Sequence, residues 1–534
     1  MKYIFVCGGV VSGLGKGIVS SSLGMLLKQC GFKVNMVKID PYLNVDAGTL
    51  RPEEHGETFV TDDGGETDQD MGNYERFLNQ NVIKDGNITS GKVYGTIIAR
   101  ERAFEYGGRD VEMIPDAPNE VKRRLYEMEG KSDFVVVEIG GTTGDIENLI
   151  YLYAARDIKR ERETMYVMVS YVPMLRNVGE LKTKPTQQAI SNLRATGISP
   201  DMLITRNETP LDKPRLETLA KRCFLDDDAI FDDPDCESIY DVPLVLEKQG
   251  ILKKIFKHFK MRTRSPNLTK WKKFTKNSKI KSPVVRLALV GKYIGKGGKM
   301  HRDVYMSVTE AIKHAAAVNK IRAEVVPVEA REGCGEELRE GNFNGMVVPQ
   351  GWGSRGVEGK IEAVKWAREN KIPYLGLCFG MQMAVIELAR NVCGFKGANS
   401  TEADPETKFP VVHIMPEQKK YLEAHQYGGT IRLGAWPCVI KKGTRLEKLY
   451  GKNEIQERHR HRYEVNNEFR ERLEKAGMVI SGTSPDGKLV EAIELPKEVH
   501  PFFVATQFHP EYLSRPLTPH PIFVGFLKAA KEKE

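Results

Sequence analysis

The sequence predicts an α/β fold made of two doubly wound domains with mainly parallel sheets. Short apolar runs rich in β-branched residues alternate with helical patterns, which is typical of parallel strands covered by helices. This alternation occurs twice, on either side of a basic stretch at residues 262–283. The chain has 534 residues, and a single hydrophobic core stops growing at about 250–300 residues. We therefore expect two domains.

The first half contains five runs of strand length, each followed by a longer helical pattern. Their apolar character is nearly continuous, as expected for strands buried on both faces. We expect these strands to build one α/β domain over residues 1–262. The runs are 3–8, 34–40, 133–140, 166–172 and 201–205.

The second half repeats the pattern after a basic segment rich in Ser, Thr and Asn. We interpret residues 263–283 as a linker and residues 284–534 as a second α/β domain. The predicted strands of this domain are 284–291, 323–328, 345–351, 373–378 and 502–508.

Composition narrows the class of protein. Hydrophobic residues make up 40% of the chain and charged residues 28%, as in globular proteins. No apolar run reaches the roughly 18 residues that span a bilayer, and the N-terminus is unlike a signal peptide. We expect a cytoplasmic protein without a membrane partner. The eight cysteines show no CxxC pairing, which argues against a disulfide framework or a zinc site.

The net charge of +8 comes from one segment. Residues 253–281 hold twelve Lys and Arg and no acidic residue, so the rest of the chain is acidic. A charged linker explains this better than a nucleic-acid groove, and we expect no nucleic-acid partner. A basic patch at a subunit contact or a phosphate site stays open as an alternative.

A glycine-rich run at residues 8–24 lies between a predicted strand and a predicted helix. Such a loop can wrap a phosphate with backbone N–H groups, and the helix N-terminus adds positive potential. Lys16 would reach the outer phosphates. The spacing GxxxxGK[ST] is missed at Val10 and at Gly17, so a structural turn is the competing interpretation.

Charged residues follow the later strands of the first half. Ligands of open α/β sheets bind beyond the carboxyl ends of strands, and a carboxylate pair there can hold Mg²⁺ against ATP phosphates. For any one of these acids taken alone, a solvated loop charge is the favoured interpretation. The candidates are Lys38, Asp40, Asp68, Asp70, Glu138, Asp145 and Glu147.

The second half carries the pattern of a thiol nucleophile. Cys378 lies in Gly-Leu-Cys-Phe-Gly between a predicted strand and a predicted helix, where a strained turn can expose the thiol and lower its pKa. His509 and Glu511 are two residues apart on or just after a strand, so the carboxylate can orient the imidazole. Alone, each motif is weak evidence. Together they predict a Cys-His-Glu triad.

Long blocks of the chain resemble the CTP synthase family of pyrimidine biosynthesis. These blocks are YIFVCGGVVSGLGKGI, VKIDPYLNVDAGT, HGETFVTDDGGETDQDMGNYERF, VEIGGTTGDIE and GELKTKPTQQ. The resemblance implies a ligase in which ATP phosphorylates O4 of UTP and ammonia then displaces the phosphate to give CTP. The second half is similar to class I glutamine amidotransferases, so glutamine is the implied nitrogen donor. The resemblance thus implies a P-loop amidoligase domain over residues 1–262 and a flavodoxin-like glutaminase domain over residues 284–534.

The resemblance also implies the nucleotide residues. It assigns Asp70 and Glu138 to Mg²⁺ and Lys38 to charge stabilisation during phosphoryl transfer. ATP is expected at Gly13, Leu14, Gly15, Lys16, Gly17, Ile18, Asp70 and Arg206. UTP, or CTP as feedback inhibitor, is expected at Ser12, Asp145, Ile146, Glu147, Lys182, Thr183, Lys184, Pro185, Thr186 and Gln187.

For the glutaminase half, the resemblance implies an oxyanion hole at Gly351 and Phe379 beside the triad. Substrate glutamine is expected at Gly351, Phe379, Gly380, Met381, Gln382, Glu402 and Arg462. GTP, the family's allosteric activator, is expected at Arg355, Thr430 and Arg432. The family further implies a homotetramer.

The chain departs from the family pattern at a few positions. Gln350 replaces a glycine beside the oxyanion hole, which would cost about 1 kcal/mol if a positive φ were needed there. Glu112 and Asp116 replace Gln and His near the pyrimidine nucleotide, and their charge would repel phosphate. Thr218 stands where a lysine is expected, and the loop at 295–303 is longer than usual.

Two alternatives remain beside this interpretation. Another glutamine-dependent amidoligase, such as one acting on a corrin-ring carboxylate, can share the two-domain plan, although the KTKPTQ and VDAGT blocks argue against it. The changed pocket residues suggest the second alternative, a non-catalytic nucleotide-binding or filament-forming scaffold. Against that alternative stands the presence of Lys16, Asp70, Glu138, Cys378, His509 and Glu511.

Overall fold

The structure is a computed structural model that describes all residues except 131, 176, 178, 296–298, 301–302, 416–417, 419–428 and 534. The chain forms two compact units, which we describe separately. The first unit comprises residues 1–46 and 70–270, and the second comprises residues 47–69 and 271–534. The sequence pattern assigns residues 47–69 to the first domain, whereas in the structure they pack with the second half of the chain.

A seven-stranded parallel sheet forms the centre of the first unit. Its strand order is β11 (Ile230–Pro234), β10 (Met202–Asn207), β7 (Glu163–Tyr171), β1 (Lys2–Gly9), β6 (Phe134–Ile139), β2 (Val34–Asp40) and β5 (Asn87–Thr89). In β1, Val6 pairs with Glu138 of β6 and with Val167 of β7. The carboxyl ends of these neighbouring strands therefore meet at one edge of the sheet, where ligands of such folds bind.

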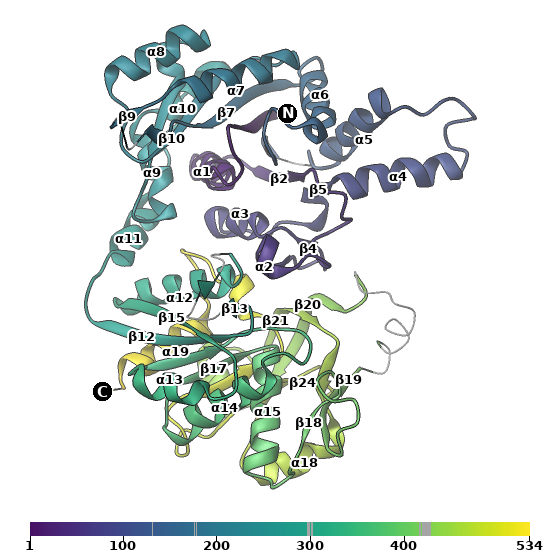
Figure 1. The fold of residues 1–534 in the computed structure, drawn as a ribbon, viewed down its shortest axis with the longest axis vertical. Helices are drawn as coiled ribbons and strands as arrows, with labels where there is room; N and C mark the ends of the chain where they lie inside the picture. The colour runs from purple at the N-terminus through teal and green to yellow at the C-terminus, as the bar shows by residue number, and fades with distance from the viewer. Residues whose placement is uncertain are drawn as a thin grey trace. The chain divides into compact units, whose positions relative to one another are not determined.

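Helices cover both faces of this sheet (Figure 1). One face carries α1 (Lys16–Gln29), α3 (Asp70–Leu78), α9 (Val242–Lys248) and α10 (Ile251–His258). The other carries α4 (Ser90–Arg102), α5 (Met113–Glu127), α6 (Leu149–Ile158), α7 (Lys184–Ala195) and α8 (Lys213–Cys223). Burial of apolar side chains from both helix layers against the strands holds this unit together.

The second unit has a nine-stranded mixed sheet. Five parallel strands come first: β15 (Arg322–Glu329), β12 (Val284–Gly291), β16 (Gly345–Val348), β17 (Tyr374–Leu377) and β25 (Phe503–Thr506). An antiparallel extension follows: β24 (Val490–Glu494), β23 (Val479–Thr483), β20 (Arg432–Ile440) and β21 (Glu454–His461). The predicted α/β class is confirmed for both halves.

Two helix layers also cover the second sheet (Figure 1). The helices α12 (Met306–Asn319) and α19 (Pro521–Lys531) pack on one face. The helices α13 (Cys334–Glu340), α14 (Val357–Glu369) and α15 (Phe379–Asn391) pack on the other. Each layer has its own buried apolar cluster, so the strands between them are shielded from water on both sides.

Smaller elements complete the described chain. The short helices are α2 (Pro52–His55), α11 (Thr269–Ser278), α17 (Arg445–Tyr450) and α18 (Asn467–Lys475), with 3-10 turns η1 (Lys84–Gly86), η2 (Ile146–Asn148), η3 (Asp227–Ala229), η4 (Ile239–Asp241) and η6 (Pro510–Leu513). The short strands are β3 (Phe59–Val60), β4 (Glu66–Thr67), β8 (Met174–Leu175), β9 (Glu180–Leu181), β13 (Ile294–Gly295), β14 (Lys299–Met300), β18 (Asn399–Ser400), β19 (Pro410–Ile414) and β22 (Tyr463–Val465).

Three predicted strands end earlier than the sequence pattern suggests. The runs predicted to end at residues 351, 378 and 508 leave the sheet after Val348, Leu377 and Thr506. The residues beyond each strand form loops at the carboxyl edge, so the polar and glycine residues in them are free to serve a site.

The predicted linker contains a helix rather than only extended chain. Trp271 and Phe274 of α11 are buried, which anchors this basic segment. Residues 296–298 and 301–302 of the lengthened loop lie outside the described residues. None of the helices that the structure describes is long and apolar enough to cross a membrane.

Candidate active sites

The glycine-rich loop of the first unit follows β1 and ends at the N-terminus of α1. Gly13 and Gly15 have φ values of 72° and 88°, and Gly15 is the N-cap of α1. Val10 also has a positive φ, 82°, which is costly for a β-branched residue. Strained backbone of this kind concentrates at ligand-binding sites. The loop thus has the conformation of a phosphate cradle although Val10 departs from the Walker A pattern.

Lys16 is the first residue of α1 and is buried. Its Nζ donates a hydrogen bond to the Gly141 carbonyl at 2.8 Å. Burial lowers the Lys16 pKa, as does nearby Lys38, while the carboxylates of Glu138 and Asp70 raise it. The nearby departure at Gly17 has a steric cause, because a Cβ there would lie 2.3 Å from Asp70 Oδ1. A serine or threonine at this position would require the Asp70 carboxylate to move.

Lys38 joins two carboxylates at the end of β2. Its Nζ lies 2.6 Å from Asp40 Oδ1 and 3.2 Å from Asp70 Oδ2. Asp40 Oδ2 also accepts a hydrogen bond from Asn87 Nδ2 at 2.8 Å. The side chains that the sequence predicts for phosphoryl transfer therefore meet at one edge of the sheet.

Glu138 ends β6 and is almost completely buried. The Tyr74 hydroxyl donates a hydrogen bond to it. Burial and the nearby Asp70 carboxylate raise the Glu138 pKa to about 8, although Lys38 and Lys16 act in the opposite direction. Two carboxylates whose charges oppose each other in a desolvated place suit a bound cation. Oxygen donors of this kind fit Mg²⁺ with phosphate and water as its further ligands.

Three segments at the carboxyl edge carry the residues expected at the pyrimidine nucleotide. Helix α7 packs against the glycine loop, because a Cβ at Gly9 would lie 2.4 Å from Ala189 Cβ. Thr143 Oγ1 donates to the Ala189 carbonyl at 3.1 Å, which ties residues 142–147 to the same helix. Ile146 is 80% exposed. Ser12, Glu147 and Lys184 are exposed as well, whereas Asp145, Lys182, Thr183, Pro185 and Gln187 are half-buried.

Thr186 differs from the rest of this expected set because it is buried. Its hydroxyl donates to the Tyr171 carbonyl at 3.1 Å and accepts from Ser170 at 3.0 Å. These bonds hold the start of α7 against β7. Thr186 therefore has a structural role in positioning the KTKPTQ segment.

Arg206 lies beside the glycine loop at the end of β10. A Cβ at Gly15 would be 3.7 Å from Arg206 Nε, which fits the expected place near a nucleotide base. The guanidinium is held by Asp233 at 3.1 Å and by Asp235 at 3.0 Å. Burial raises the Asp233 pKa to about 6, and Arg206 opposes this shift.

Asp116 is not a free charge. Arg109 binds its carboxylate through both terminal nitrogens, and the backbone N–H of Glu112 donates to it at 2.9 Å. The expected repulsion of phosphate by Asp116 therefore needs correction, because its charge is compensated locally. Thr218 is exposed, and its hydroxyl donates to the Pro214 carbonyl at 2.8 Å within α8.

Cys378 occupies a strained turn between β17 and α15 in the second unit. Its φ and ψ are 52° and −102°, a region that residues other than glycine rarely adopt. The turn is also tight, because a Cβ at Gly380 would lie 1.9 Å from the Val348 carbonyl oxygen. This geometry is that of a nucleophile elbow, in which the thiol points away from the backbone at a helix N-terminus.

His509 and Glu511 form a buried pair next to this turn. Their Nδ1 and Oε1 atoms are 2.7 Å apart. The residues lie beyond β25, at the start of η6, so a tight helical turn brings the side chains together. Burial lowers the His509 pKa, but the negative charges of Glu511 and Cys378 outweigh this and raise it to about 10. The pair therefore favours a protonated imidazole at His509, next to the Cys378 side chain.

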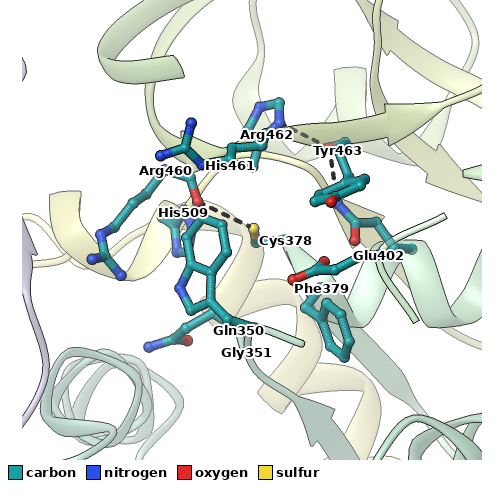
Figure 2. A pocket seen from close by; sticks show the side chains of 12 residues that line it. Gln350, Gly351, Cys378, Phe379, Glu402, Arg460, His461, Arg462, Tyr463 and His509 are labelled. Atoms are coloured by element: carbon teal, nitrogen blue, oxygen red, sulfur yellow. Dashed lines mark hydrogen bonds between the residues drawn. The ribbon is translucent and has the colours of Figure 1, made fainter. Parts of the chain in front are cut away.

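The triad opens into a pocket lined by twelve residues. Figure 2 shows Cys378 at its centre, with His509 and Arg460 on one side and Glu402 and Phe379 on the other. The Gln382 amide donates to the Tyr463 carbonyl at 2.9 Å. The lining residues are Gln350, Gly351, Trp352, Cys378, Phe379, Gln382, Glu402, Arg460, His461, Arg462, Tyr463 and His509.

Five of the seven residues expected to bind glutamine line this pocket. Gly380 and Met381 do not, because both are buried in the first turn of α15. Strain at Gln350 was expected only if this position needed a positive φ. Gln350 is not among the described residues with positive φ, so this strain does not arise. A side chain at this position is therefore compatible with the backbone.

Residues 458–462 of β21 and the following turn form one wall of the site. The Arg460 carbonyl lies 3.7 Å from Cys378 Sγ (Figure 2), and the Arg458 carbonyl accepts the His509 backbone N–H at 2.8 Å. Gln507 Nε2 is 3.6 Å from the same sulfur. The sequence motifs name neither Gln507 nor the two arginines, because backbone carbonyls leave no signal in side-chain identity.

Residues 47–69 support this wall from behind. Asp62 pairs with Arg458 at 2.5 Å and Glu66 with Arg460 at 2.8 Å. The Thr58 carbonyl accepts from the Tyr512 hydroxyl at 3.0 Å. Tyr512 in turn stacks on His509, with ring centroids 5.0 Å apart. This part of the VTDDGGETD run thus braces the thiol site.

Comparison with known proteins agrees with both halves of this description. Residues 2–261 match the family described as CTP synthase N-terminus, and residues 300–529 match glutamine amidotransferase class-I. CTP synthase of Methanocaldococcus jannaschii is 50% identical, over 99% of this chain and 98% of its own length. The chain belongs to the CTP synthase family.

Other relatives extend this similarity to bacteria and to a solved structure. CTP synthase of Bacillus subtilis is 47% identical over 99% of both chains. A structure described as Trypanosoma brucei CTPS glutaminase domain with bound acivicin is 40% identical, covering 47% of this chain and 95% of that chain, with a TM-score of 0.42.

The three residues expected to bind GTP differ from one another in exposure and in hydrogen-bond or ion-pair partner. Arg355 is exposed and pairs with Glu53 at 2.8 Å. Thr430 accepts a hydrogen bond from Arg462 at 2.9 Å. Arg432 is buried and pairs with Glu491 at 2.8 Å. Only Arg355 therefore presents its charge to solvent.

Proposed function

We propose that this chain converts UTP to CTP with ATP and with ammonia taken from glutamine. The observation that carries the proposal is the pairing of two sites in one chain. One is the buried Cys378–His509–Glu511 set in a strained turn. The other is the cluster of lysines and carboxylates beside a glycine-rich helix N-terminus. The full-length similarity to CTP synthases supports the same reaction.

In the first unit, the glycine loop would hold ATP phosphates with backbone N–H groups. Lys16 and Lys38 would offset charge while the γ-phosphoryl group moves to O4 of the uracil. Asp70 and Glu138 would hold Mg²⁺, which supplies positive charge against the phosphate oxygens when bound. Ammonia then attacks C4, and inorganic phosphate leaves.

In the second unit, the Cys378 thiolate would attack the carboxamide carbon of glutamine. The His509 imidazolium gives its proton to the departing nitrogen, so ammonia leaves and a glutamyl thioester remains. His509, now neutral, takes a proton from water as that water attacks the thioester. Glutamate is released and the starting charges are restored. Glu511 orients the imidazole throughout.

Several finer features stay part of this proposal. GTP would activate through Arg355 with Thr430 and Arg432, and CTP would inhibit at the pyrimidine nucleotide site. The homotetramer implied by the family stays a prediction as well. The cytoplasmic location expected from the sequence also stays a prediction.

The decisive experiment measures nucleotide products from UTP, ATP and Mg²⁺ with glutamine or ammonium, with and without GTP. We expect CTP, ADP and phosphate in equal amounts, with glutamate in addition when glutamine is the donor. Absence of CTP with both donors would reject the proposal in favour of the scaffold alternative. Amide formation on a carboxylate acceptor instead of UTP would favour another amidoligase.

A further inference from the structure

Two buried lysines lie behind the loop 349–353 of the glutaminase pocket. Lys360 of α14 is fully buried, and Lys292 after β12 is 4% exposed. Burying an ammonium group is costly unless it is paired or has a function. Neither lysine has a carboxylate partner in an ion pair among the described residues; both bind backbone carbonyls of this one loop instead.

Lys360 binds the first part of the loop. Its Nζ donates to the Pro349 carbonyl at 2.6 Å and to the Gln350 carbonyl at 3.4 Å. Lys292 binds the second part, donating to the carbonyl of Trp352 and to that of Gly353, the latter at 3.0 Å. The carbonyls of residues 349, 350, 352 and 353 are thus turned toward the Nζ atoms of the two lysines.

Because the peptide group is planar, the direction of each carbonyl also fixes the direction of the N–H group in the same peptide. In a trans peptide the C=O and the following N–H point in opposite directions. The Trp352–Gly353 peptide demonstrates the effect. Its carbonyl faces Lys292, and its N–H donates to Glu402 in the pocket lining at 2.6 Å. By the same geometry, a Gln350 carbonyl that faces Lys360 turns the Gly351 N–H toward the pocket.

Gly351 and Phe379 are the two positions expected to form the oxyanion hole. Both line the pocket with Cys378. Among the described residues, no hydrogen bond is donated by either backbone N–H. The two lysines also reach the second position, because each ammonium lies over the Phe379 ring, at 5.0 Å for Lys360 and 5.3 Å for Lys292.

The loop leaves no room for adjustment at Gly351. A Cβ there would lie 2.5 Å from Lys292 Cδ and 3.5 Å from Lys360 Nζ. Lys292 therefore leaves no space for a side chain at this position unless it moves, while Lys360 Nζ lies at ordinary contact distance. Close packing of this kind fixes a donor before the reaction, which is what oxyanion stabilisation needs.

We propose that Lys360 is a positioning residue that aims the Gly351 N–H at the oxyanion of the glutaminase reaction, while Lys292 holds the Gly353–Glu402 contact of the glutamine-binding wall. This inference rests on the proposed glutaminase function. It assigns different kinetic roles to two lysines that bind the same loop. Lys360 acts on turnover, and Lys292 acts on substrate affinity.

The test uses three variants of the full-length chain. Lys360→Met removes the donor but keeps the side-chain length, Lys292→Met does the same at the second lysine, and Lys365→Met alters an exposed lysine of the same helix as a control. Glutamine-dependent glutamate release gives kcat and KM. Ammonia-dependent CTP formation reports the rest of the enzyme.

Alkylation of Cys378 is measured as well, because it separates oxyanion stabilisation from thiol reactivity. Iodoacetamide alkylates a thiolate by displacement at carbon and forms no oxyanion. We expect Lys360→Met to lower kcat for glutamine about 10- to 100-fold, with KM, alkylation of Cys378 and ammonia-dependent activity unchanged. Lys292→Met should raise KM with a smaller effect on kcat, and Lys365→Met should match the wild-type enzyme.

Other results would overturn the inference. A Lys360→Met kcat within about twofold of wild type, or alkylation that falls in step with kcat, would exclude the proposed role. If Lys360→Met misfolds and loses ammonia-dependent activity, Lys360→Gln is measured in its place. This variant keeps an N–H donor at the position and tests whether Lys360 positions the loop. Its kcat should lie below wild type at unchanged KM, and an unchanged kcat would reject the proposal. A wild-type chain that releases no glutamate would instead reject the glutaminase function.

Discussion

The two candidate sites are built in opposite ways. In the glutaminase site, Cys378, His509 and Glu511 are each at most 5% exposed, and their geometry is fixed by a strained turn and an internal ion pair. In the nucleotide site, the inner charges Lys16 and Glu138 are buried but the glycine loop and Ile146 are exposed. One site is complete within its own unit. The other presents donors to a ligand.

This difference follows from the chemistry of the two ligands. Glutamine brings no charge to its reacting amide, so the protein must supply the ionised nucleophile, the acid and the oxyanion donors in advance. A nucleoside triphosphate brings several negative charges that satisfy lysines and backbone N–H groups when it binds. The comparison predicts that substitutions in one site affect a single nitrogen donor, whereas those in the other affect both.

The largest donor-selective effect is expected for Cys378→Ala. Without the thiolate no glutamyl thioester forms, so glutamine-dependent CTP formation should fall about 10⁴-fold or more, while ammonia-dependent formation stays near the wild-type rate. Steady-state assays with the two donors measure the ratio. Cys334→Ala is the matched control, because this buried cysteine lies outside the pocket lining. Equal activity of Cys378→Ala with both donors would refute the triad.

Lys16→Ala tests the nucleotide site, where a substitution should affect both nitrogen donors. Removing the ammonium that faces the phosphates should lower CTP formation about 10³-fold with either donor. Lys28→Ala at the far end of α1 controls for effects on the helix. Near-normal turnover of the Lys16 variant with ammonia would show that Lys16 has no role in phosphoryl transfer.

Glu511→Gln should have a smaller effect and change the pH profile. Glu511 raises the His509 pKa, so its loss lowers that pKa, and the alkaline limb of glutamine-dependent activity should move to lower pH. We expect about a 10²-fold lower kcat. Activity measured from pH 6 to 10 with both donors checks this. An alkaline limb that does not move would place the titration elsewhere.

The same ion pair has a stability signature. The folded His509 pKa is raised to about 10, against an unfolded value of about 6.5. Its contribution to stability is therefore full below about pH 6.5 and is lost as the pH rises toward the folded pKa. The loss of melting temperature in Glu511→Gln should be larger at pH 6 than at pH 10.

The smallest effect is expected from Asp116 and Glu112. The sequence alone predicts that Asp116→His with Glu112→Gln tightens UTP binding by removing negative charge. Because Arg109 already compensates Asp116, we now expect UTP affinity to change less than about fivefold, the equivalent of one exposed ion pair. Titration of UTP against the double variant measures this. A larger gain in affinity would show that these charges face the ligand.

Much of the glutaminase triad could be predicted from sequence because its parts are local. A strand, a turn and a helix around Cys378 have a compact pattern, and His509 and Glu511 are close neighbours. Most of the parallel strands were equally readable, since near-continuous apolar runs require burial on both faces, but the short edge strands β5 and β11 were not predicted. The antiparallel strands β20–β24 gave no such signal, because charged residues such as Arg458 and Glu491 interrupt them.

The sequence by itself determined the α/β class, and it identified Cys378 and the lysines and acids of the nucleotide edge as candidate site residues. Only the tertiary structure decided that residues 47–69 brace the glutaminase wall, that Arg109 neutralises Asp116, and that Lys360 and Lys292 hold the loop behind Gly351. The physical reason is the same in each case. These contacts join groups far apart in sequence, or bind backbone carbonyls, and neither kind of contact follows from the periodicity or identity of nearby side chains.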